Sequence, residues 1–557
     1  MPRMEAGLKD VSPLPKSSLE MLAPLFTLRH LKAGFLPYYT ALLQEADDVL
    51  AVGAACALLD AANIPPMIIP RLLELGKFEA VRQRAFDLFL KNFEFDIAAS
   101  FSKVHLRPMG DLGQRTMDAT LTLDHAALTA VQIDRYLESG NAEDLSKASN
   151  AANEEGGWKK SLPLMLKLVI LNPQDGDWLL QLCRLLDDAN QYELLQRLCE
   201  VLETSDVFPV ISTIARAMLA RNEKAYDHGL KLLDQLKSKS LPRLAEINIC
   251  RLRADFLDGA GKSQEAYSWY VRLQKFHISK NPDRNFYFSN IKKNAAVAVP
   301  QLPKDDHIRD FIMLGFPRSG TTLLENALAS HPQIETFEEV PAFASVVHLL
   351  SKHVEKDSSL SAELCIGARD RYYRELERRK GKAGAEIFID KLPILSGQGI
   401  FLKKLFPEKK YIFSIRHPYD VVLSCFKQFF DSNPAMDNLT TFEGACRTYN
   451  FVMTHWFSAF GLDSEQVCYV RYDDLVADMR KEVTRVLDFV GADWDEGILQ
   501  FDRRAQERAG KTPSYAKVRK GLSIGRQSAW ENYKFLFRKP EARQLDAWVK
   551  FFGYPGL

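Results

Sequence analysis

Apolar residues in the first half of the chain recur every three to four positions, from about residue 17 to residue 277. That spacing is the period of an amphipathic α-helix, so that Leu162, Met165 and Val169, for example, would share one helix face. Polar or glycine-containing breaks such as 258–262 separate the periodic segments, and no alternating strand pattern occurs between them. The pattern therefore predicts a succession of short helices packed in pairs.

One window of this region is similar to a tetratricopeptide repeat. Its small and aromatic positions are Ala254, Leu257, Gly261, Ala266 and Tyr270. A strict period of about 34 residues does not extend across the region, so a plain helical bundle stays open as the alternative. We expect residues 1–282 to form an all-α, tetratricopeptide-like solenoid.

The hydrophobic pattern changes in the second half. Residues 283–307 mix polar and apolar positions and contain Pro300 and Pro303, so we assign them to a linker. In residues 308–557, short apolar or β-branched runs alternate with helical segments; the runs are 311–314, 387–389, 411–415 and 467–472. This alternation predicts an α/β domain with a central parallel sheet and ligand loops at the carboxyl ends of its strands.

The composition excludes several classes of protein. The 557 residues have a formal net charge of +1, so no global field attracts nucleic acid or an anionic membrane. The eight cysteines form no Cys-x-x-Cys pair, and we interpret them as reduced core residues rather than ligands of a metal. The chain does not start with a signal-like apolar segment, and the apolar run at 49–59 is too short to span a bilayer. We therefore expect a cytoplasmic protein without a membrane span.

The first candidate ligand-binding element is the turn Gly315-Phe-Pro-Arg-Ser-Gly-Thr-Thr322, which follows an apolar run and leads into a helix-forming segment. Backbone N–H groups in such a turn, and the positive end of the helix dipole, form a cradle for an anion. The spacing is that of the nucleotide-triphosphate loop G-x-x-x-x-G-K-[ST], except that Thr321 replaces the lysine that reaches the β and γ phosphates. The loop thus favours a nucleotide with one terminal 5′ phosphate group, and an incidental strand–turn–helix connection is the structural alternative.

A second anion-binding element follows the run 411–415. Arg416 ends that predicted strand, and Ser424 lies two turns into the next predicted helix. An arginine fork and a hydroxyl at the same sheet edge suit a second phosphate group.

The loop and the Arg416/Ser424 pair together resemble the 5′-phosphosulfate and 3′-phosphate motifs of sulfotransferases, which transfer a sulfuryl group from 3′-phosphoadenosine 5′-phosphosulfate (PAPS). The arginine in the loop, Arg318, makes the loop resemble that of protein-tyrosine sulfotransferases and their bacterial relatives. The helical half resembles a tetratricopeptide-linked bacterial branch of the family. The resemblance covers residues 308–557 and implies PAPS as the donor co-substrate, with no metal. It implies donor binding by Arg318, Ser319, Gly320, Thr321, Thr322, Arg416, Ser424, Arg519, Lys520 and Gly521.

The resemblance also implies catalytic residues. Protein-tyrosine sulfotransferases carry a Glu-Glu pair, and Glu339 follows Arg318 by the same 21 residues that separate the second Glu from the loop arginine there. We assign the general base to Glu339, with Glu338 as the other candidate. Lys391, in a Lys-Leu-Pro segment after a strand, would stabilise charge on the oxygen between sulfur and the 5′ phosphate.

A third segment, residues 514–533, resembles two branches of the family, and a different part of the segment carries each resemblance. Arg519-Lys-Gly resembles the 3′-phosphate loop of cytosolic sulfotransferases. Ser528, two residues before Trp530, matches a serine that assists at the transferred group in the protein-tyrosine branch. The two branches disagree on which of these residues contacts the donor, so Arg526 is a further candidate. The alternative is that the segment is a basic, solvated loop.

The resemblance therefore implies sulfuryl transfer from PAPS to an acceptor hydroxyl, by in-line displacement. The glutamate pair and the loop arginine favour a tyrosine of a peptide or protein, or another phenol, as the acceptor, with a glycan or lipid-linked sugar as the alternative. A small-molecule kinase is disfavoured by the missing loop lysine. A scaffold with an inactive nucleotide-binding domain is the alternative of another class, and the helical half could dock a protein partner in either case.

Overall fold

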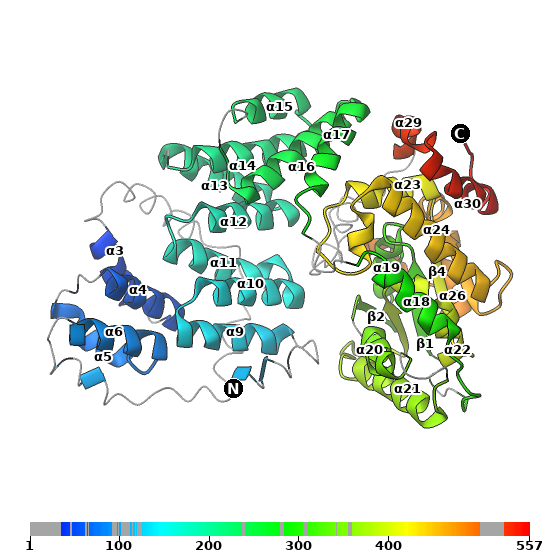
Figure 1. Ribbon diagram of the computed structural model, residues 1–557, viewed down its shortest axis with the longest axis horizontal. Helices are drawn as coiled ribbons and strands as arrows, with labels where there is room; N and C mark the ends of the chain where they lie inside the picture. Colours follow the sequence, from blue (N-terminus) through cyan, green and yellow to red (C-terminus); the bar gives the residue numbers. More distant parts are fainter. Residues whose placement is uncertain are drawn as a thin grey trace. The chain divides into compact units, whose positions relative to one another are not determined.

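The computed structural model describes residues 35–44, 47–61, 64, 66–91, 97, 100–101, 112–113, 115–116, 119, 125–205, 207–236, 240–278, 283–304, 307, 309–340, 342–354, 359–501 and 528–557 (Figure 1). The chain divides into two compact units, Met1–Leu252 and Arg253–Leu557. None of the described helices is both long enough and apolar enough to cross a bilayer.

All the described secondary-structure elements of the first unit are helices, as the apolar period predicted. Its helices are α3 (Phe35–Leu42), α4 (Asp48–Asp60), the 3₁₀ helix η2 (Pro66–Ile68), α5 (Ile69–Leu75), α6 (Glu79–Lys91), α9 (His125–Ser139), α10 (Ala142–Gly156), α11 (Trp158–Leu171), α12 (Gly176–Asp188), α13 (Tyr192–Ser205), α14 (Pro209–Asn222), α15 (Tyr226–Asp234) and the first part of α16 (Arg243–Gly259).

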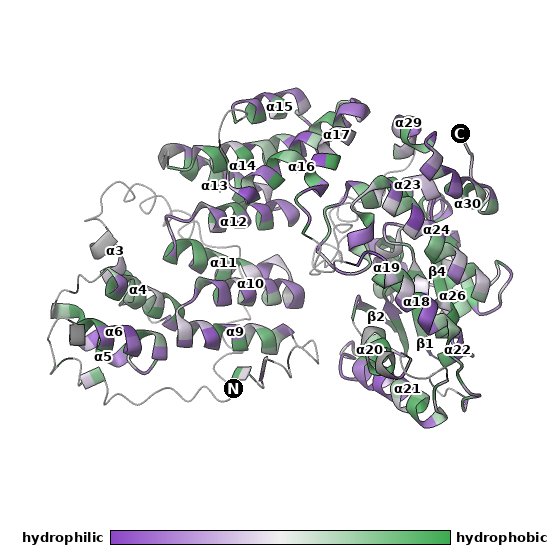
Figure 2. Ribbon diagram, viewed as in Figure 1, coloured by the Kyte–Doolittle hydropathy of each residue, from purple (hydrophilic) through white to green (hydrophobic). Residues whose placement is uncertain are grey.

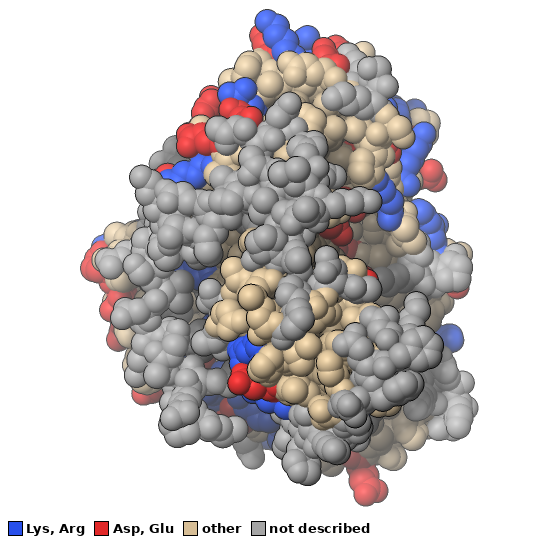
Figure 3. Space-filling model, turned by 90° about the vertical axis from the view of Figure 1, so that its left-hand side faces the viewer, with Lys and Arg blue, Asp and Glu red and all other residues tan. Residues whose placement is uncertain are grey.

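Successive helices of this unit pack against each other, as α9, α10 and α11 do. Leu162, Met165 and Val169 are buried in α11, which confirms the predicted helix face. Green and purple residues alternate along most of the helices in Figure 2, the pattern of helices with one buried face. On the face shown in Figure 3, charged side chains of both signs are interspersed among the described residues. The tetratricopeptide-like character of the unit stays a prediction.

The second unit contains a five-stranded parallel sheet in the order β2-β3-β1-β4-β5. Its strands are β1 (Asp310–Gly315), β2 (Ile334–Glu338), β3 (Ile387–Lys391), β4 (Tyr411–Ile415) and β5 (Val467–Arg471). The central strands β1 and β4 are buried along their whole length, as expected for a parallel sheet covered on both faces. Strand β2 was not predicted from the sequence, because this edge strand carries three polar residues among five.

The other elements of the second unit are helices, some of which pack on this sheet. They are α17 (Ser263–Gln274), α18 (Phe286–Ala296), α19 (Thr321–Ala329), α20 (Ala342–Val354), α21 (Ala362–Glu377), η3 (Pro393–Gln398), α22 (Gly399–Leu405), α23 (Pro418–Lys427), η4 (Met436–Leu439), α24 (Phe442–Ala459), α25 (Tyr472–Ala477), α26 (Met479–Val490), η5 (Glu496–Gln500), η6 (Ala529–Tyr533), α29 (Lys534–Phe537), η7 (Pro540–Leu545) and α30 (Asp546–Phe551).

Two hydrophobic layers hold the helices on the sheet. In one, Leu324 of α19 and Leu487 of α26 join Met313 of β1 in a single buried cluster. In the other, Trp456 of α24 is fully buried and stacks on Phe413 of β4, with ring centres 4.5 Å apart. The helix face around Trp456 is therefore a packing surface.

Helix α18 lies inside the range 283–307 that the sequence assigned to a linker. Its Asn294 donates a hydrogen bond to Gln398 at 3.2 Å, and the carbonyl of Ala295 accepts one from Lys404 at 2.6 Å. These contacts tie α18 to η3 and α22 of the second unit. The predicted domain bounds at 282 and 308 stay a prediction, although α18 gives this segment a regular structure that its two prolines did not suggest.

Candidate active site

The loop at the carboxyl end of β1 has an unusual backbone. Gly315 has φ +151° and Gly320 has φ +97°. A Cβ at Gly315 would lie 2.7 Å from the carbonyl oxygen of Ser414, and one at Gly320 would lie 2.4 Å from Cδ2 of Tyr472, so both positions require glycine. Arg318 adopts a left-handed conformation, with φ +73°, that non-glycine residues rarely use. Strained backbone at the start of a helix is typical of a site that binds an anion through N–H groups.

The side chain of Arg318 reaches across to α23. Its Nε donates a hydrogen bond to Oγ of Ser424 at 3.1 Å. Burial lowers the pKa of Arg318, and the positive charge of Arg416 acts in the same direction. An arginine nevertheless stays protonated in a protein, so the loop keeps a fixed positive charge. The structure thus joins the two predicted phosphate-binding motifs by a direct contact.

Arg416 follows β4 and faces the same loop. Its Nη1 donates to the carbonyl oxygen of Arg318 at 3.5 Å, and its Nη2 lies 3.6 Å from a carboxylate oxygen of Asp420. The guanidinium also lies 4.7 Å from the centre of the Tyr472 ring. Its Nε is buried and has no hydrogen-bond partner among the described residues. A buried donor of this kind fits a site that takes a phosphate group.

Lys391, at the carboxyl end of β3, is surrounded by carboxylates. Its Nζ lies 3.2 Å from Glu325, 3.3 Å from Glu338 and 3.2 Å from Glu339. The side chains of Lys391 and Glu325 are completely buried, whereas that of Glu339 is 35% exposed. Glu339 has φ +48°, and its backbone N–H donates to the carbonyl of Lys391 at 2.8 Å. The sheet therefore brings the predicted glutamate pair and the predicted lysine into contact, with Glu339 as the more accessible carboxylate.

The strand order explains why these groups meet. Glu338 pairs in register with Lys391, and β3 lies directly beside β1, whose end carries the loop. Oγ of Ser396, just after β3, donates to the carbonyl of Gly315 at 3.1 Å. From β1 the chain runs to one side of the sheet through β2 and β3, and to the other side through β4 and β5. Parallel sheets bind ligands at such a reversal of strand order, outside the carboxyl ends of the strands.

Ser528 begins the described part of the third predicted segment. Two residues later, the backbone N–H of Trp530 donates to Oδ1 of Asp420 at 3.1 Å. Asp420 also contacts Arg416, so one carboxylate connects the segment after Ser528 to the second phosphate motif. The other predicted residues of this segment lie outside the described residues; they are Arg519, Lys520, Gly521 and Arg526.

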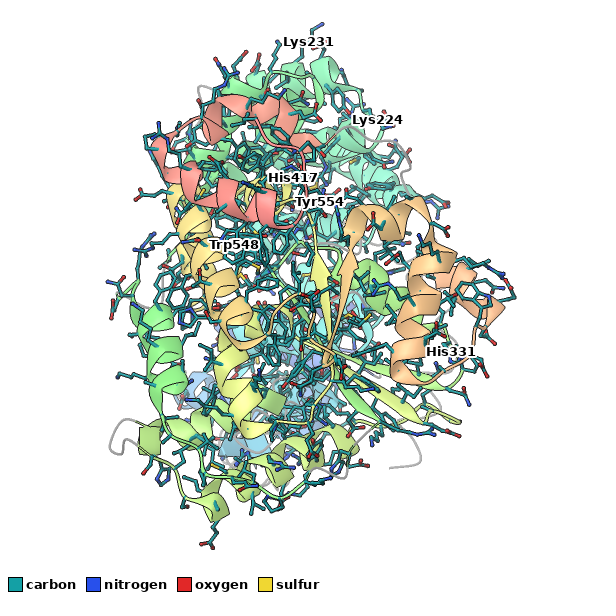
Figure 4. The ribbon with its side chains drawn as sticks, turned by 90° about the vertical axis from the view of Figure 1, so that its right-hand side faces the viewer. Lys224, Lys231, His331, His417, Trp548 and Tyr554 are labelled. Carbon is teal, nitrogen blue, oxygen red and sulfur yellow. The ribbon has the colours of Figure 1, made fainter. Side chains whose placement is uncertain are left out.

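His417 connects the same region to the last residues of the chain. Its Nδ1 accepts the backbone N–H of Tyr419 at 3.2 Å, so the proton resides on Nε2, which donates to the carbonyl of Pro555 at 3.0 Å. Its ring lies 5.1 Å from that of Trp530 and 5.0 Å from that of Tyr554, beside which it is labelled in Figure 4. Burial lowers the pKa of His417. The imidazole is therefore a structural group held in its neutral form.

Two residues of this region were missed from the sequence. Glu325 is the one acidic residue of α19 and follows Thr321 by one helical turn. Asp420 follows Arg416 by four residues, but Arg416 precedes α23, so the contact joins a loop residue to the first turn of that helix. The residues near each carboxylate along the chain do not reveal its distant contact, which is Lys391 for Glu325 and Trp530 for Asp420.

Comparisons with known proteins show what the chain is similar to. Residues 310–496 match the model of the sulfotransferase family. Protein-tyrosine sulfotransferase A of Caenorhabditis elegans is 26% identical over 208 residues, which cover 35% of this chain and 53% of that protein. An uncharacterized protein of Aquifex aeolicus (strain VF5) is 27% identical over 249 residues, covering 41% of this chain and 31% of that protein. The chain thus spans only part of the length of these relatives.

Among solved structures, the sulfotransferase domain from the curacin biosynthetic pathway is 19% identical, with a TM-score of 0.31, and the match covers 46% of this chain and 99% of that domain. The match to the sulfotransferase family model lies within the second unit. The chain is also similar to protein-tyrosine sulfotransferases, as the arginine in the loop indicated.

Proposed function

We propose that this protein transfers the sulfuryl group of PAPS to an acceptor hydroxyl, and that the acceptor is a tyrosine of a peptide or protein. The observation that carries the proposal is the contact between Lys391 and Glu339 at the sheet edge beside the loop 315–322. A cation and an accessible carboxylate next to an anion cradle are the groups that an in-line transfer to a hydroxyl needs.

The donor site in this proposal has two ends. The loop, with its hydroxyls at Thr321 and Thr322, would hold the 5′ phosphosulfate. Arg416 and Ser424 would hold the 3′ phosphate, which ATP lacks. The buried Nε of Arg416 and its contact with the loop carbonyl support this assignment.

Bound PAPS supplies an activated sulfuryl group whose bond to the bridging oxygen can be broken. Glu339 accepts the proton of the acceptor hydroxyl while that oxygen forms its bond to sulfur. Lys391 and Arg318 stabilise the negative charge that develops as the bridging oxygen leaves with the bisphosphate. Ser528 is assigned to the transferred group by its position two residues before Trp530. The products are the sulfate ester, 3′,5′-adenosine bisphosphate and a proton on Glu339.

A tyrosine acceptor is supported by the glutamate pair and by the relation to protein-tyrosine sulfotransferases. A phenol, with a pKa of about 10, gives up its proton to a carboxylate more readily than a sugar hydroxyl does. A carboxylate base without a metal is therefore suited to a phenol.

The donor site is tested by thermal unfolding with 3′,5′-adenosine bisphosphate, ADP and ATP in parallel. A ligand at about a hundred times its dissociation constant stabilises the native state by roughly 2.7 kcal/mol. We expect this stabilisation from the bisphosphate alone, and we expect it to be lost in Arg416→Ala. Arg480→Ala is the matched control, since Arg480 is an exposed arginine of the same unit that pairs with Glu496. Equal stabilisation by ATP would contradict the donor assignment.

The acceptor and the base are tested with ³⁵S-labelled PAPS. Label should enter a tyrosine-containing peptide and not the same peptide with phenylalanine in place of tyrosine. Glu339→Gln should lower kcat by about a hundredfold or more, and Glu338→Gln by much less. Label that enters only a glycan would refute the tyrosine acceptor and retain the sulfotransferase reaction.

A further inference from the structure

Glu325 is a buried carboxylate that the proposed reaction does not yet use. It lies in α19, one turn beyond the first loop hydroxyl at Thr321, in a helix that is otherwise free of charge. Its Oε2 is 3.2 Å from Nζ of Lys391, and its Oε1 accepts a hydrogen bond from Oγ1 of Thr336 at 3.2 Å. The helix that follows the anion cradle therefore contacts the lysine at the end of β3 directly.

A negative charge at this position is costly on two counts. A fully buried carboxylate loses its hydration, and Glu325 also lies one helical turn from the loop proposed to bind an anion. Pairing with a cation offsets both effects, and Lys391 is the cation that Glu325 contacts. The carboxylate is therefore arranged to hold the lysine, since it would repel the nucleotide.

The three carboxylates around Lys391 differ in accessibility. Glu325 and Glu338 are buried, at 0% and 3% side-chain exposure, whereas Glu339 is 35% exposed. The ammonium thus has two buried anionic contacts and one contact toward the accessible side. Since the buried contacts come from α19 and from β2, they fix the ammonium relative to both the loop and the proposed base.

We propose that Glu325 is a positioning residue, which holds the Lys391 ammonium between the loop helix and Glu339 so that it can act on the leaving oxygen. Glu325 touches neither the nucleotide nor the acceptor in this assignment and acts through Lys391. The inference rests on the proposed sulfuryl transfer and adds a residue to it.

The test is a double-mutant cycle of Glu325→Gln and Lys391→Met in the full chain, assayed with labelled PAPS and the tyrosine peptide. Glu325→Gln should lower kcat about tenfold to a hundredfold and leave KM for PAPS within about twofold, because a misplaced group impairs the reaction more than binding. Lys391→Met should lower kcat about a hundredfold to a thousandfold. In the Lys391→Met background, Glu325→Gln should cause no further loss of kcat and should raise the Tm, because it removes a buried carboxylate that has lost its cation.

Two further variants separate positioning from a purely structural role. Glu325→Asp keeps the charge and should retain more activity than Glu325→Gln. Glu375→Gln removes another buried carboxylate of the same unit, one that pairs with Arg379 at 2.8 Å, and should lower Tm without changing kcat. If Glu325→Gln does not fold, the comparison of Lys391→Met with the double variant still decides, since equal kcat values are expected.

Independent effects of the two substitutions on kcat would overturn the inference, as would equal impairment by Glu325→Asp and Glu325→Gln. A wild-type chain that transfers label while Glu325→Gln keeps full kcat overturns this inference alone. A wild-type chain that transfers no label to the peptide, to p-nitrophenol or to a glycan overturns the proposed function together with the inference.

Discussion

Asp390 is a buried carboxyl group in β3, immediately before Lys391, and its ionisation should control how the stability of the sheet depends on pH. Burial raises the pKa of Asp390 to about 7, while the hydroxyl of Tyr372 and the charges of Arg379 and Lys391 act in the opposite direction. The Tyr372 hydroxyl donates to Oδ2 at 3.0 Å, whereas Oδ1 is buried without a hydrogen-bond partner among the described residues. Substitution Asp390→Asn replaces the carboxyl by a neutral group of the same shape.

The sign and the size of the effect follow from the raised pKa. The folded chain binds this proton more tightly than the unfolded chain, where the ordinary pKa is 3.8, so stability falls as pH rises between about 4 and 7. Each tenfold difference in proton affinity is worth about 1.4 kcal/mol, so ionising Asp390 costs the folded state on the order of 4 kcal/mol. Between pH 5 and pH 8 the wild type should lose roughly 2–3 kcal/mol relative to Asp390→Asn.

The measurement is pulsed hydrogen exchange with mass spectrometry across a urea series, because a chain of two compact units does not unfold in one step. Peptides that cover β1 and β3 report the transition of the sheet. Its free energy of unfolding is compared between wild type and Asp390→Asn at pH 5, 6, 7 and 8.

Tyr372→Phe is the informative control. Loss of the hydroxyl removes a hydrogen bond that favours the ionised form, so the pKa of Asp390 rises and the pH-dependent loss of stability extends to higher pH. A difference between wild type and Asp390→Asn that is the same at pH 5 and pH 8 would refute the reasoning.

Three further predictions concern other parts of the second unit. Gly320→Ala should abolish stabilisation by the bisphosphate and destabilise the loop by about 1–3 kcal/mol, because its Cβ would lie 2.4 Å from Tyr472; an unchanged Tm shift with the ligand contradicts this. Asp258→Asn should lower the free energy of unfolding by roughly 1–2 kcal/mol in urea, because it breaks the 2.9 Å ion pair with the largely buried Lys427. Adding Lys427→Met should recover part of that loss, and additive losses would contradict a direct pairing. The pKa of His417 is lowered, so the stability that its neutral form provides is present above its ordinary pKa and lost as pH falls through the folded value. Amide exchange in residues 549–557, corrected for its intrinsic rate, should therefore accelerate from pH 7 to pH 5 in wild type and not in His417→Gln; equal acceleration in both contradicts it.

The sequence was most informative where the chemistry is local. The glycines of the loop 315–322, the apolar run before it and the helix-forming segment after it are contiguous, so the anion cradle could be predicted from a few adjacent residues. Arg416 was likewise placed correctly at the end of a strand, because a run of five apolar or small residues precedes it. The edge strand β2 was not predicted, since its polar residues conceal the period of a strand.

Contacts between distant segments required the tertiary structure. Glu325 and Lys391 are 66 residues apart and belong to different elements, and nothing in either segment indicates the other. The same is true of Asp420: Arg416 is close to it along the chain, but Trp530, whose backbone N–H donates to Asp420, is 110 residues away.

The sequence alone determined which residues can form a strand, a helix or a tight turn, because periodicity, glycine conformations and helix ends depend on neighbours along the chain. It also indicated the class of the domain, through the loop and the arginine–serine pair. Only the tertiary structure decided which strand ends adjoin, because the order β2-β3-β1-β4-β5 depends on burial of many side chains at once. That order brings Lys391 between Glu325 and the glutamate pair, where low hydration makes each charge depend on its neighbours.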